Sequence, residues 1–445
     1  MSRHPSRREF LRATSAGAAA LSFAAPSYGR VLGANGRIRL GFLGVANRGM
    51  QLLDAFLAHD DVEVPALCDV SGSAVQRANR RVGGKADCCA DFRKLLDRKD
   101  LDALVIATPD HWHAVQTISA CNAGKDVYVE KPLSITIREG RRMVEVARRT
   151  KRVVQVGIHR RSSEVYARAA RWIASNQLGK ITVCRCYHLS NMYPEGIGKA
   201  PPSDPPKDLD WDLWLGPRPE RPYQATIAPY KFRWWDLYSS QVANQGVHFL
   251  DAIRWMTGDL APASICAMGG RFAVEDDRTI PDTMEVTFQC PSGRLILFGQ
   301  YEASGNLAMA RDAYAELRGT QGTAYLSEEL VSVVPERGGQ FQDRKPRMEP
   351  TQLKPVEEKQ PGKRQGNLSA TALHARNFLD CMQSRALPNC DVEIGHRSTT
   401  FSLLANISLA TRLRLEWDPE REQITNSPEA NRLLHYEYRK PWTLD

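Results

Sequence analysis

Short apolar runs alternate with amphipathic segments through the first third of the chain. The runs at 37–45, 62–70, 101–109, 126–130 and 153–157 have the length and side chains of buried strands, and helical periodicity fills the intervals. Such alternation is typical of a doubly wound parallel sheet with right-handed crossovers. The pattern therefore predicts an α/β fold that begins with an open parallel sheet covered by helices.

From about Lys180 the pattern changes to an alternation of polar and apolar side chains with a period of two. It predicts strands at 180–189, 263–274, 283–290, 293–303 and 313–320, and no helical pattern separates the last four. We predict a C-terminal α+β domain over 160–445, built on a large, mostly antiparallel open sheet whose exposed face favours a homo-oligomer. Two late amphipathic segments, 370–385 and 399–413, are expected to form helices that pack back on the body.

Two long segments follow neither pattern. Residues 193–223 are rich in proline and tryptophan, and a loop of this length inside a compact chain is usually a lid or an interface arm. Residues 331–366 are polar, proline-rich and charged, which favours an extended excursion from the fold.

Charge and cysteine content exclude several functional classes. The 445 residues include 60 Lys and Arg and 51 Asp and Glu, giving a net charge of +9, and no basic run is interleaved with aromatic residues. This argues against nucleic acid as a partner. The ten cysteines form no C-x-x-C pair, and His111 and His113 would diverge by about 200° on a helix, so we expect no metal site.

The N-terminus carries an export pattern. Residues 6–12 read SRREFLR, which matches the twin-arginine signal S-R-R-x-F-L-K with arginine in place of the final lysine. The Ala- and Gly-rich stretch that follows is too short to span a bilayer stably. We predict a signal peptide over residues 1–30, recognition by the twin-arginine export machinery, and a periplasmic location after folding in the cytoplasm. A disordered basic N-terminus is the alternative.

The first predicted strand ends in a turn that matches part of a dinucleotide-binding motif. The motif G-x-G-x-x-G falls on Gly44, Ala46 and Gly49, and a helical segment follows. Gly44 allows the tight turn, while backbone N–H groups at the helix N-terminus can bind a pyrophosphate. Asp69 ends the next strand, 20 residues after Gly49, where its carboxylate can bind both ribose hydroxyls.

These residues predict a Rossmann domain over 36–159 that binds NAD, with Asn47 and Arg48 in the same turn. Arg77 and Arg80 on the following helix leave NADP open. The methyl group of Ala46 stands where a phosphate approaches the backbone most closely, so a turn without ligand is an alternative. Because twin-arginine export carries folded proteins, we expect a tightly bound cofactor, loaded in the cytoplasm and carried out inside the protein.

Polar residues follow the other parallel strands directly, at the sheet edge where such folds bind ligands. Lys131 comes after a buried strand in the sequence Glu-Lys-Pro, so its partly desolvated ammonium can hydrogen-bond a substrate hydroxyl and stabilise a developing alkoxide. A surface lysine in a loop is the alternative. Further residues expected near the cofactor are Thr108, Pro109, His113 and Glu130, and those expected near the substrate are His159 and Arg161.

A helix predicted over 242–258 carries a second set of polar residues. Asn244, His248 and Asp251 share one side of it. His248 can take the proton of a substrate hydroxyl as general base while Lys131 polarises the oxygen. A histidine held in the core by a neighbouring carboxylate is the alternative.

In this order the motifs resemble the family of glucose–fructose oxidoreductase, inositol dehydrogenase and MocA, over about residues 37–440. The resemblance rests on GFLGVANRG, ATPDHWHA, EKPLS, NQGVHFLD and DVEIGHRS, and LDWDLWLGP and EYRKPW are similar to a branch with twin-arginine leaders. It implies a nicotinamide-dependent sugar or cyclitol oxidoreductase in which Lys131 and His248 act on the substrate hydroxyl. The family's aspartate falls on Asn244, which implies an orienting contact to substrate, and the family's proline suggests a cis bond before Pro132.

Three functions are compatible with this resemblance. The first is hydride transfer from a ring carbon of a sugar or sugar derivative to tightly bound NAD(P). The second, implied by some relatives, is a redox-neutral glycosidase cycle of oxidation, elimination, hydration and reduction. The third is a sugar-binding protein without catalytic activity, which only Ala46 and Asn244 favour.

Overall fold

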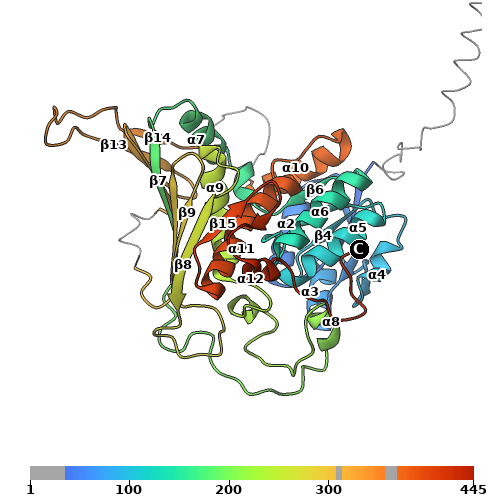
Figure 1. Cartoon of the computed structure of the whole chain (residues 1–445). Helices are drawn as coiled ribbons and strands as arrows, with labels where there is room; N and C mark the ends of the chain where they lie inside the picture. Colours follow the sequence, from blue (N-terminus) through green and yellow to red (C-terminus); the bar gives the residue numbers. More distant parts are fainter. Residues whose placement is uncertain (1–35, 307–312, 356–367) are drawn as a thin grey trace, which may run out of the picture.

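The computed structural model describes residues 36–306, 313–355 and 368–445. They form two sheets that lie side by side, with helices packed between and around them (Figure 1). The predicted signal peptide, residues 1–30, lies outside the described residues, and so does the last part of the polar segment at 331–366.

The first sheet has six parallel strands in the spatial order β3-β2-β1-β4-β5-β6. Every residue of β4, β5 and β6 is buried, which explains their continuous apolar sequences. This is the strand order of a Rossmann fold, so the predicted doubly wound sheet is confirmed. The strands are β1 Ile38–Leu43, β2 Val62–Cys68, β3 Asp87–Cys89, β4 Ala103–Ile106, β5 Asp126–Val129 and β6 Val154–Val156.

The crossover helices fix the turns that follow each strand. They are α2 Asn47–Leu57, α3 Gly72–Arg81, α4 Arg93–Leu96, α5 His113–Asn122 and α6 Ile137–Thr150. Helix α6 begins at a capping box, in which the hydroxyl of Thr136 accepts from the N–H of Glu139 and the Glu139 carboxylate accepts from the N–H of Thr136. The short turn that carries Lys131, between β5 and α6, is therefore held at both ends.

The second sheet has ten strands in the order β14-β13-β12-β11-β7-β10-β9-β8-β15-β16. Neighbouring strands are antiparallel except for β7 and β10, so the prediction of a mostly antiparallel sheet is confirmed. The strands are β7 Ile181–Leu189, β8 Ser264–Gly270, β9 Thr283–Gln289, β10 Leu295–Tyr301, β11 Ala315–Gly319, β12 Gly322–Leu326, β13 Val331–Pro335, β14 Thr351–Leu353, β15 Leu415–Asp418 and β16 Gln423–Ile424.

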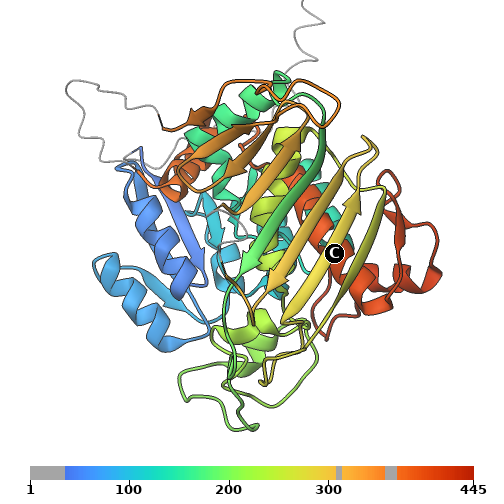
Figure 2. The ribbon, with the colours of Figure 1, turned by 90° about the vertical axis from the view of Figure 1, so that its left-hand side faces the viewer.

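In the described ranges, helices cover one face of the second sheet and leave the other uncovered (Figure 1 and Figure 2). α7 (Glu164–Ala174), α9 (Val247–Thr257) and α11 (Val392–Thr411) lie between this sheet and the first domain, and Figure 2 looks onto the opposite, uncovered face. Helix α10 (Ala370–Ser384) packs on the first domain instead, where Phe378 meets Phe56 edge-on with ring centroids 6.3 Å apart. The C-terminal chain thus ties the two domains together.

Two segments differ from the prediction. Within the expected excursion at 331–366, β13 and β14 extend the sheet by antiparallel pairing. Helix α11 begins at Val392 rather than at 399. Its first turns carry buried polar side chains that contact other elements, as Ser398 contacts Asp251, so apolar periodicity does not mark them.

The segment rich in proline and tryptophan is ordered by aromatic packing. It contains the short helix α8 (Trp211–Leu215), and a 3-10 turn at Lys231–Trp234 follows it, beyond the predicted bounds 193–223. Trp214 stacks on Trp211 with ring centroids 4.7 Å apart and meets Tyr238 edge-on at 5.0 Å. We call residues 203–238 the aromatic arm.

Candidate functional site

A groove of about 230 Å³ runs along the carboxyl ends of the parallel strands. Its position is the one at which open α/β sheets bind nucleotides. Seven of the ten residues predicted to bind the cofactor line it: Gly44, Ala46, Asn47, Arg48, Asp69, Thr108 and Pro109. Of the other three, Gly49 packs beneath the turn, while His113 and Glu130 line an adjoining cavity.

The glycine turn has the geometry that an anion site requires. Gly44 has φ +78°, and a Cβ there would lie 2.7 Å from the backbone of Ala107. A Cβ on Gly49 would lie 1.9 Å from the carbonyl oxygen of Gly44, so α2 can approach the turn only with glycine at this position. No side chain caps α2 within the described chain, which leaves its first N–H groups directed at the groove. The methyl group of Ala46 forms part of the groove wall and does not close it.

Asp69 is fixed by the backbone around it. Its Oδ2 accepts from the N–H of Val45 at 2.8 Å, and its Oδ1 accepts from the N–H of Ser71 at 2.9 Å. Each carboxylate oxygen has two lone pairs, so both can still accept from ribose hydroxyls. Arg77 also lines this end of the groove.

The aromatic arm also lines the groove. Its contributions to the lining are Leu209, Leu213, Trp214, Pro229, Tyr230, Phe232 and Arg233. The arm is attached to the first domain by backbone hydrogen bonds, since the N–H of Gly72 donates to the carbonyl of Asp208 at 2.8 Å. In addition, the indole N–H of Trp112 donates to the carbonyl of Leu213 at 3.0 Å. The sequence indicated a lid or an interface arm here but did not identify these residues.

A cavity of about 260 Å³ adjoins the groove and shares six lining residues with it, Asn47, Arg48, Ala107, Thr108, Tyr230 and Arg233. Four residues predicted for catalysis or for the substrate line this cavity: Lys131, His159, Asn244 and His248. The sequence reasoning did not assign a site role to Asp110, Tyr230, Arg233 or Gln245, which also line it. Tyr230 and Arg233 lie on the aromatic arm, and Gln245 directly follows the predicted Asn244. No sequence motif or residue spacing identifies these three residues.

Lys131 is half-buried and lines the cavity. Its Nζ donates to the side-chain Oδ1 and to the backbone carbonyl of Asn244, each at 2.8 Å. Burial lowers the pKa of Lys131 to about 8; the neighbouring Glu130 opposes this shift, and Arg233 adds to it. The Lys131–Pro132 peptide bond is cis, as the resemblance suggested.

Arg48 and Glu130 bind each other. Arg48 Nε donates to Glu130 Oε1 at 2.7 Å, joining the glycine turn to the strand end before Lys131. Burial alone would raise the pKa of Glu130, but the charges of Arg48 and Lys131 hold it below its ordinary value. Gly157 makes room for this carboxylate, because a Cβ there would lie 2.8 Å from Glu130 Oε1.

His248 and His159 lie together above the lysine, with ring centroids 5.2 Å apart. Burial lowers the pKa of His248 well below its ordinary value, and the charge of Lys131 lowers it further. Burial likewise lowers the pKa of His159 to about 3. Both rings are therefore neutral near pH 7, and the Nδ1 of His248 has no hydrogen-bond partner among the described residues. A neutral, unpartnered imidazole can accept a proton.

The structure separates Arg161 from this group, contrary to the prediction of a substrate contact. Arg161 Nε donates to both carboxylate oxygens of Asp251, at 2.9 and 3.0 Å, and neither residue lines the cavity. A π-helical turn at Val242–Gly246 precedes α9, and Asn244 and His248 reach the cavity while Asp251 does not. Arg161 therefore joins η2 (His159–Ser162), the turn after β6, to α9 by an ion pair with the buried carboxylate of Asp251.

His113 and Asp110 contact protein groups at the cavity wall. The Nδ1 and Nε2 atoms of His113 lie 2.7 and 2.9 Å from the carbonyl oxygens of Pro132 and Thr108. The ring therefore holds two strand ends together. Asp110 accepts a hydrogen bond from the hydroxyl of Ser239, and burial raises the pKa of its carboxyl group. Asp110 itself begins the 3-10 turn Asp110–Trp112, whose N-cap residue is Pro109.

The described residues hold no group of three or more His, Cys, Asp or Glu side chains arranged to bind a metal ion. All ten cysteines are free thiols in the structure. No helix in the described ranges is long and apolar enough to cross a membrane.

Comparison with curated proteins finds local similarity. A glycosyl hydrolase family 109 protein of Saccharopolyspora erythraea is 36% identical over 172 residues, 33% of this chain and 38% of that protein. An α-N-acetylgalactosaminidase of Shewanella oneidensis is 32% identical over 123 residues, 26% of this chain and 27% of that protein. The chain thus spans between 27% and 38% of the length of these two relatives.

Comparison with solved structures finds the same fold over most of the chain. Levoglucosan dehydrogenase in complex with NADH and levoglucosan has a TM-score of 0.65 at 16% identity, covering 85% of this chain and 99% of that one. The WlbA dehydrogenase from Bordetella pertussis, in complex with NADH and UDP-GlcNAcA, has a TM-score of 0.60 at 20% identity, covering 86% and 99%.

Two family models account for most of the sequence. The one described as "Oxidoreductase family, NAD-binding Rossmann fold" matches residues 38–158. The one described as "Oxidoreductase family, C-terminal alpha/beta domain" matches residues 178–327 and 363–444. Both models describe the family that the motifs around Lys131 and His248 resemble. The chain therefore belongs to the Gfo/Idh/MocA oxidoreductase family, and its N-terminal domain is an NAD-binding Rossmann domain.

Proposed function

We propose that this protein oxidises a hydroxyl group of a sugar or sugar derivative with a nicotinamide dinucleotide that it keeps bound. One observation carries the proposal: a half-buried ammonium, that of Lys131, and the neutral imidazole of the buried His248 line one cavity that adjoins the dinucleotide groove. Oxidation of an alcohol needs a group that accepts the hydroxyl proton and a group that stabilises the charge on its oxygen.

The groove fits a dinucleotide in three respects. The uncapped N-terminus of α2 is suited to the pyrophosphate, the carboxylate of Asp69 to the adenosine ribose, and the open end beside Thr108 to the nicotinamide. When bound there, the oxidised nicotinamide supplies the acceptor for hydride from the substrate carbon. The carboxylate of Asp69 favours NAD, while Arg77 at the same end keeps NADP as an alternative.

Two residues of the cavity have separate tasks: Lys131 donates a hydrogen bond to the substrate oxygen, and His248 accepts the hydroxyl proton. Two of the three Nζ–H groups of Lys131 are used by Asn244, and the third can donate to the substrate oxygen. His248 accepts the hydroxyl proton as the C–H bond breaks and the C=O bond forms. In this arrangement Asn244 orients the lysine, in addition to any contact with the substrate that the resemblance implies.

A redox-neutral glycosidase is the second candidate function. Two observations favour it: the local similarity to glycosyl hydrolase family 109 proteins, and the seven side chains of the aromatic arm that line the groove, which we expect to slow cofactor exchange. In such a cycle the hydride returns to the sugar after elimination and hydration. No external oxidant is then needed, which suits an enzyme that works away from the cytoplasmic dinucleotide pool.

We further propose that the protein is exported by the twin-arginine route to the periplasm with the dinucleotide already bound, and that it forms a homo-oligomer through the uncovered sheet face. The motif at residues 6–12 supports export. Exposed Met268 on β8 and partly exposed Leu295 on β10 support association through that face. Cell fractionation and light scattering of the full chain test these two points.

The central experiment uses protein purified with its native cofactor. Denaturation and mass spectrometry should release a nicotinamide dinucleotide, and sugars should change the absorbance of the reduced-nicotinamide band. A lasting change supports net oxidation, whereas release of the leaving group from a chromogenic glycoside without added NAD supports the glycosidase cycle. Absence of bound dinucleotide and of both activities would favour the non-catalytic sugar-binding protein.

A further inference from the structure

Arg233 stands at the junction of the groove and the cavity, and none of the described residues is its anionic partner. It belongs to the 3-10 turn at Lys231–Trp234 of the aromatic arm and lines both spaces. Its guanidinium lies over the rings of Tyr230 and Phe232, 4.4 and 4.5 Å from their centroids. Its one hydrogen bond within the described chain runs from Nη1 to the carbonyl of Tyr230, at 3.0 Å, and no described carboxylate lies within ion-pair distance.

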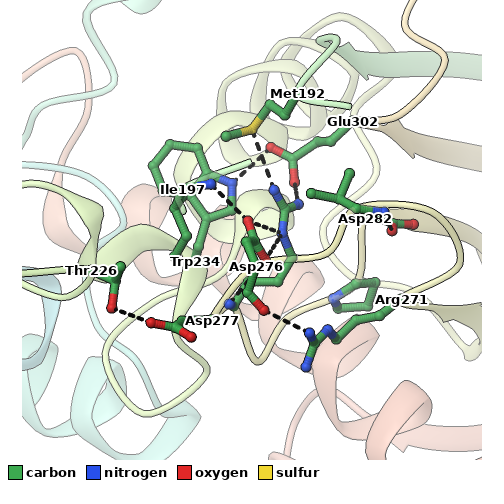
Figure 3. A network of polar contacts seen from close by, with 12 residues as sticks. Met192, Ile197, Thr226, Trp234, Arg271, Asp276, Asp277, Asp282 and Glu302 are labelled. Carbon is green, nitrogen blue, oxygen red and sulfur yellow. Dashed lines mark hydrogen bonds and ion pairs between the residues drawn. The ribbon is translucent and has the colours of Figure 1, made fainter. Parts of the chain in front are cut away.

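A buried polar network holds this turn in place, as Figure 3 shows. The indole N–H of Trp234 donates to Glu302 Oε1 at 3.0 Å, and Glu302 Oε2 accepts from Arg278 Nη1 at 2.7 Å. Arg278, which is fully buried, also donates from Nε to both carboxylate oxygens of Asp276, at 2.9 and 3.0 Å. The backbone next to Arg233 is thus attached to the loop between β8 and β9 and to the end of β10. The guanidinium is presented from a fixed support.

The charges that line the cavity do not balance. Arg48, Lys131 and Arg233 are cationic, and the described carboxylates among the lining residues are those of Asp110 and Glu130. Glu130 is paired with Arg48, and burial raises the pKa of Asp110, which favours its neutral form. The ammonium of Lys131 and the guanidinium of Arg233 therefore face the cavity without a paired carboxylate. An oxidised nicotinamide in the groove would add a further positive charge.

We propose that the substrate is an acidic sugar, and that Arg233 binds its carboxylate and determines this specificity. Four N–H groups of the guanidinium remain available, and a planar carboxylate matches two of them in parallel. A neutral sugar would leave the cavity with excess positive charge in a partly desolvated space, which is unfavourable. This proposal rests on the proposed sugar oxidation, since it concerns the substrate of the same cavity.

The test compares the wild-type holoenzyme with Arg233→Gln, and uses Arg171→Gln, at an exposed position of α7, as matched control. The probes are glucuronate, galacturonate and gluconate, the neutral sugars glucose and galactose, and glucose 6-phosphate. Binding is measured by calorimetry and turnover by absorbance, so that binding is detected even if no sugar is oxidised. We expect the wild type to bind at least one of the sugar acids about 100-fold more tightly than the neutral sugars. Arg233→Gln should lose about that factor for the acid, mainly in KM, with unchanged dinucleotide content.

Three results would overturn the proposal. Loss of the dinucleotide from Arg233→Gln would show that the guanidinium binds a cofactor phosphate. Equal weakening of acidic and neutral sugars would show a general role in shaping the cavity. Preference of the wild type for glucose 6-phosphate over all the sugar acids would replace the carboxylate by a phosphate. Tight binding of a sugar acid without any turnover would contradict only the proposed oxidation and would leave the role of Arg233 intact.

Discussion

The ammonium of Lys131 donates to two oxygens of one residue, the side-chain Oδ1 and the backbone carbonyl of Asn244, each at 2.8 Å. The two residues are 113 positions apart and come from different domains. The bidentate contact leaves one N–H of the ammonium for the cavity and fixes its direction. A charged side chain that is half-buried and oriented by neutral oxygens keeps its affinity for an anionic oxygen of a substrate.

Replacing Lys131 by methionine should lower turnover by about 10³-fold while leaving the dinucleotide content unchanged, because methionine fills the volume but cannot donate a hydrogen bond. Steady-state kinetics and mass spectrometry of the denatured protein measure the two quantities. Asn244→Ala, which removes one of the two contacts, should have a smaller effect than the loss of the lysine. A Lys131→Met enzyme with turnover near that of the wild type would contradict the proposed role.

The activity should fall as pH rises through about 8, the pKa to which burial lowers the ammonium of Lys131. Below this pKa the lysine is protonated and can donate; above it the neutral amine is a weaker donor and carries no charge for the alkoxide. The pKa of His248 lies well below its ordinary value, so the base stays neutral and active at pH 6–8. A profile of kcat/KM against pH that rises through 8 would instead assign the lysine as the base.

His248→Asn should lower kcat by about 10²-fold with little change in KM, because the amide retains polarity but accepts a proton poorly. The measurement is a comparison of kcat and KM for the sugar that the substrate screen identifies. A solvent isotope effect on kcat in the wild type that disappears in the variant would identify the step. An unchanged kcat would show that His248 is a buried core residue without a catalytic role.

Gly49→Ala should destabilise the first domain and lower dinucleotide content. Its new Cβ would lie 1.9 Å from the carbonyl oxygen of Gly44, and only movement of α2 away from the turn relieves this contact. Gly72→Ala is the matched control, because a Cβ there meets its nearest neighbour at 3.7 Å in the first turn of α3. Thermal unfolding should show a lower Tm for Gly49→Ala and no decrease for Gly72→Ala.

Removing Arg278 should unfold or strongly destabilise the protein. Arg278→Met leaves the carboxylates of Asp276 and Glu302 buried without their cation, and breaking a buried ion pair in this way costs about 3–5 kcal/mol. Chemical denaturation compares this variant with Arg81→Met, whose arginine pairs with Asp54 on an exposed surface. Equal stability of the two variants would contradict the structural role of the network.

Lys131 and Arg161 show what can be predicted from local sequence patterns and what cannot. The position of Lys131 at a strand end could be predicted because parallel strands bury their length and bring their carboxyl ends to one edge. The same reasoning failed for Arg161, which also follows a strand, because a side chain with a long stem turns toward the nearest buried carboxylate, here that of Asp251. Strand position restricts where a residue lies, and local charge decides where its side chain points.

The sequence by itself determined the two sheets, the glycine turn, and the strand-end positions of Asp69, Glu130 and Lys131, because these depend on periodicity and on short-range turn chemistry. Only the tertiary structure decided that Asn244 binds Lys131 and that Arg48 pairs with Glu130. It also decided that the aromatic arm brings Arg233 over the groove. Such contacts join residues from distant parts of the chain. The Arg48–Glu130 pair forms when the glycine turn meets the end of β5 within the first domain, and the other two form only when the two separately patterned domains pack together.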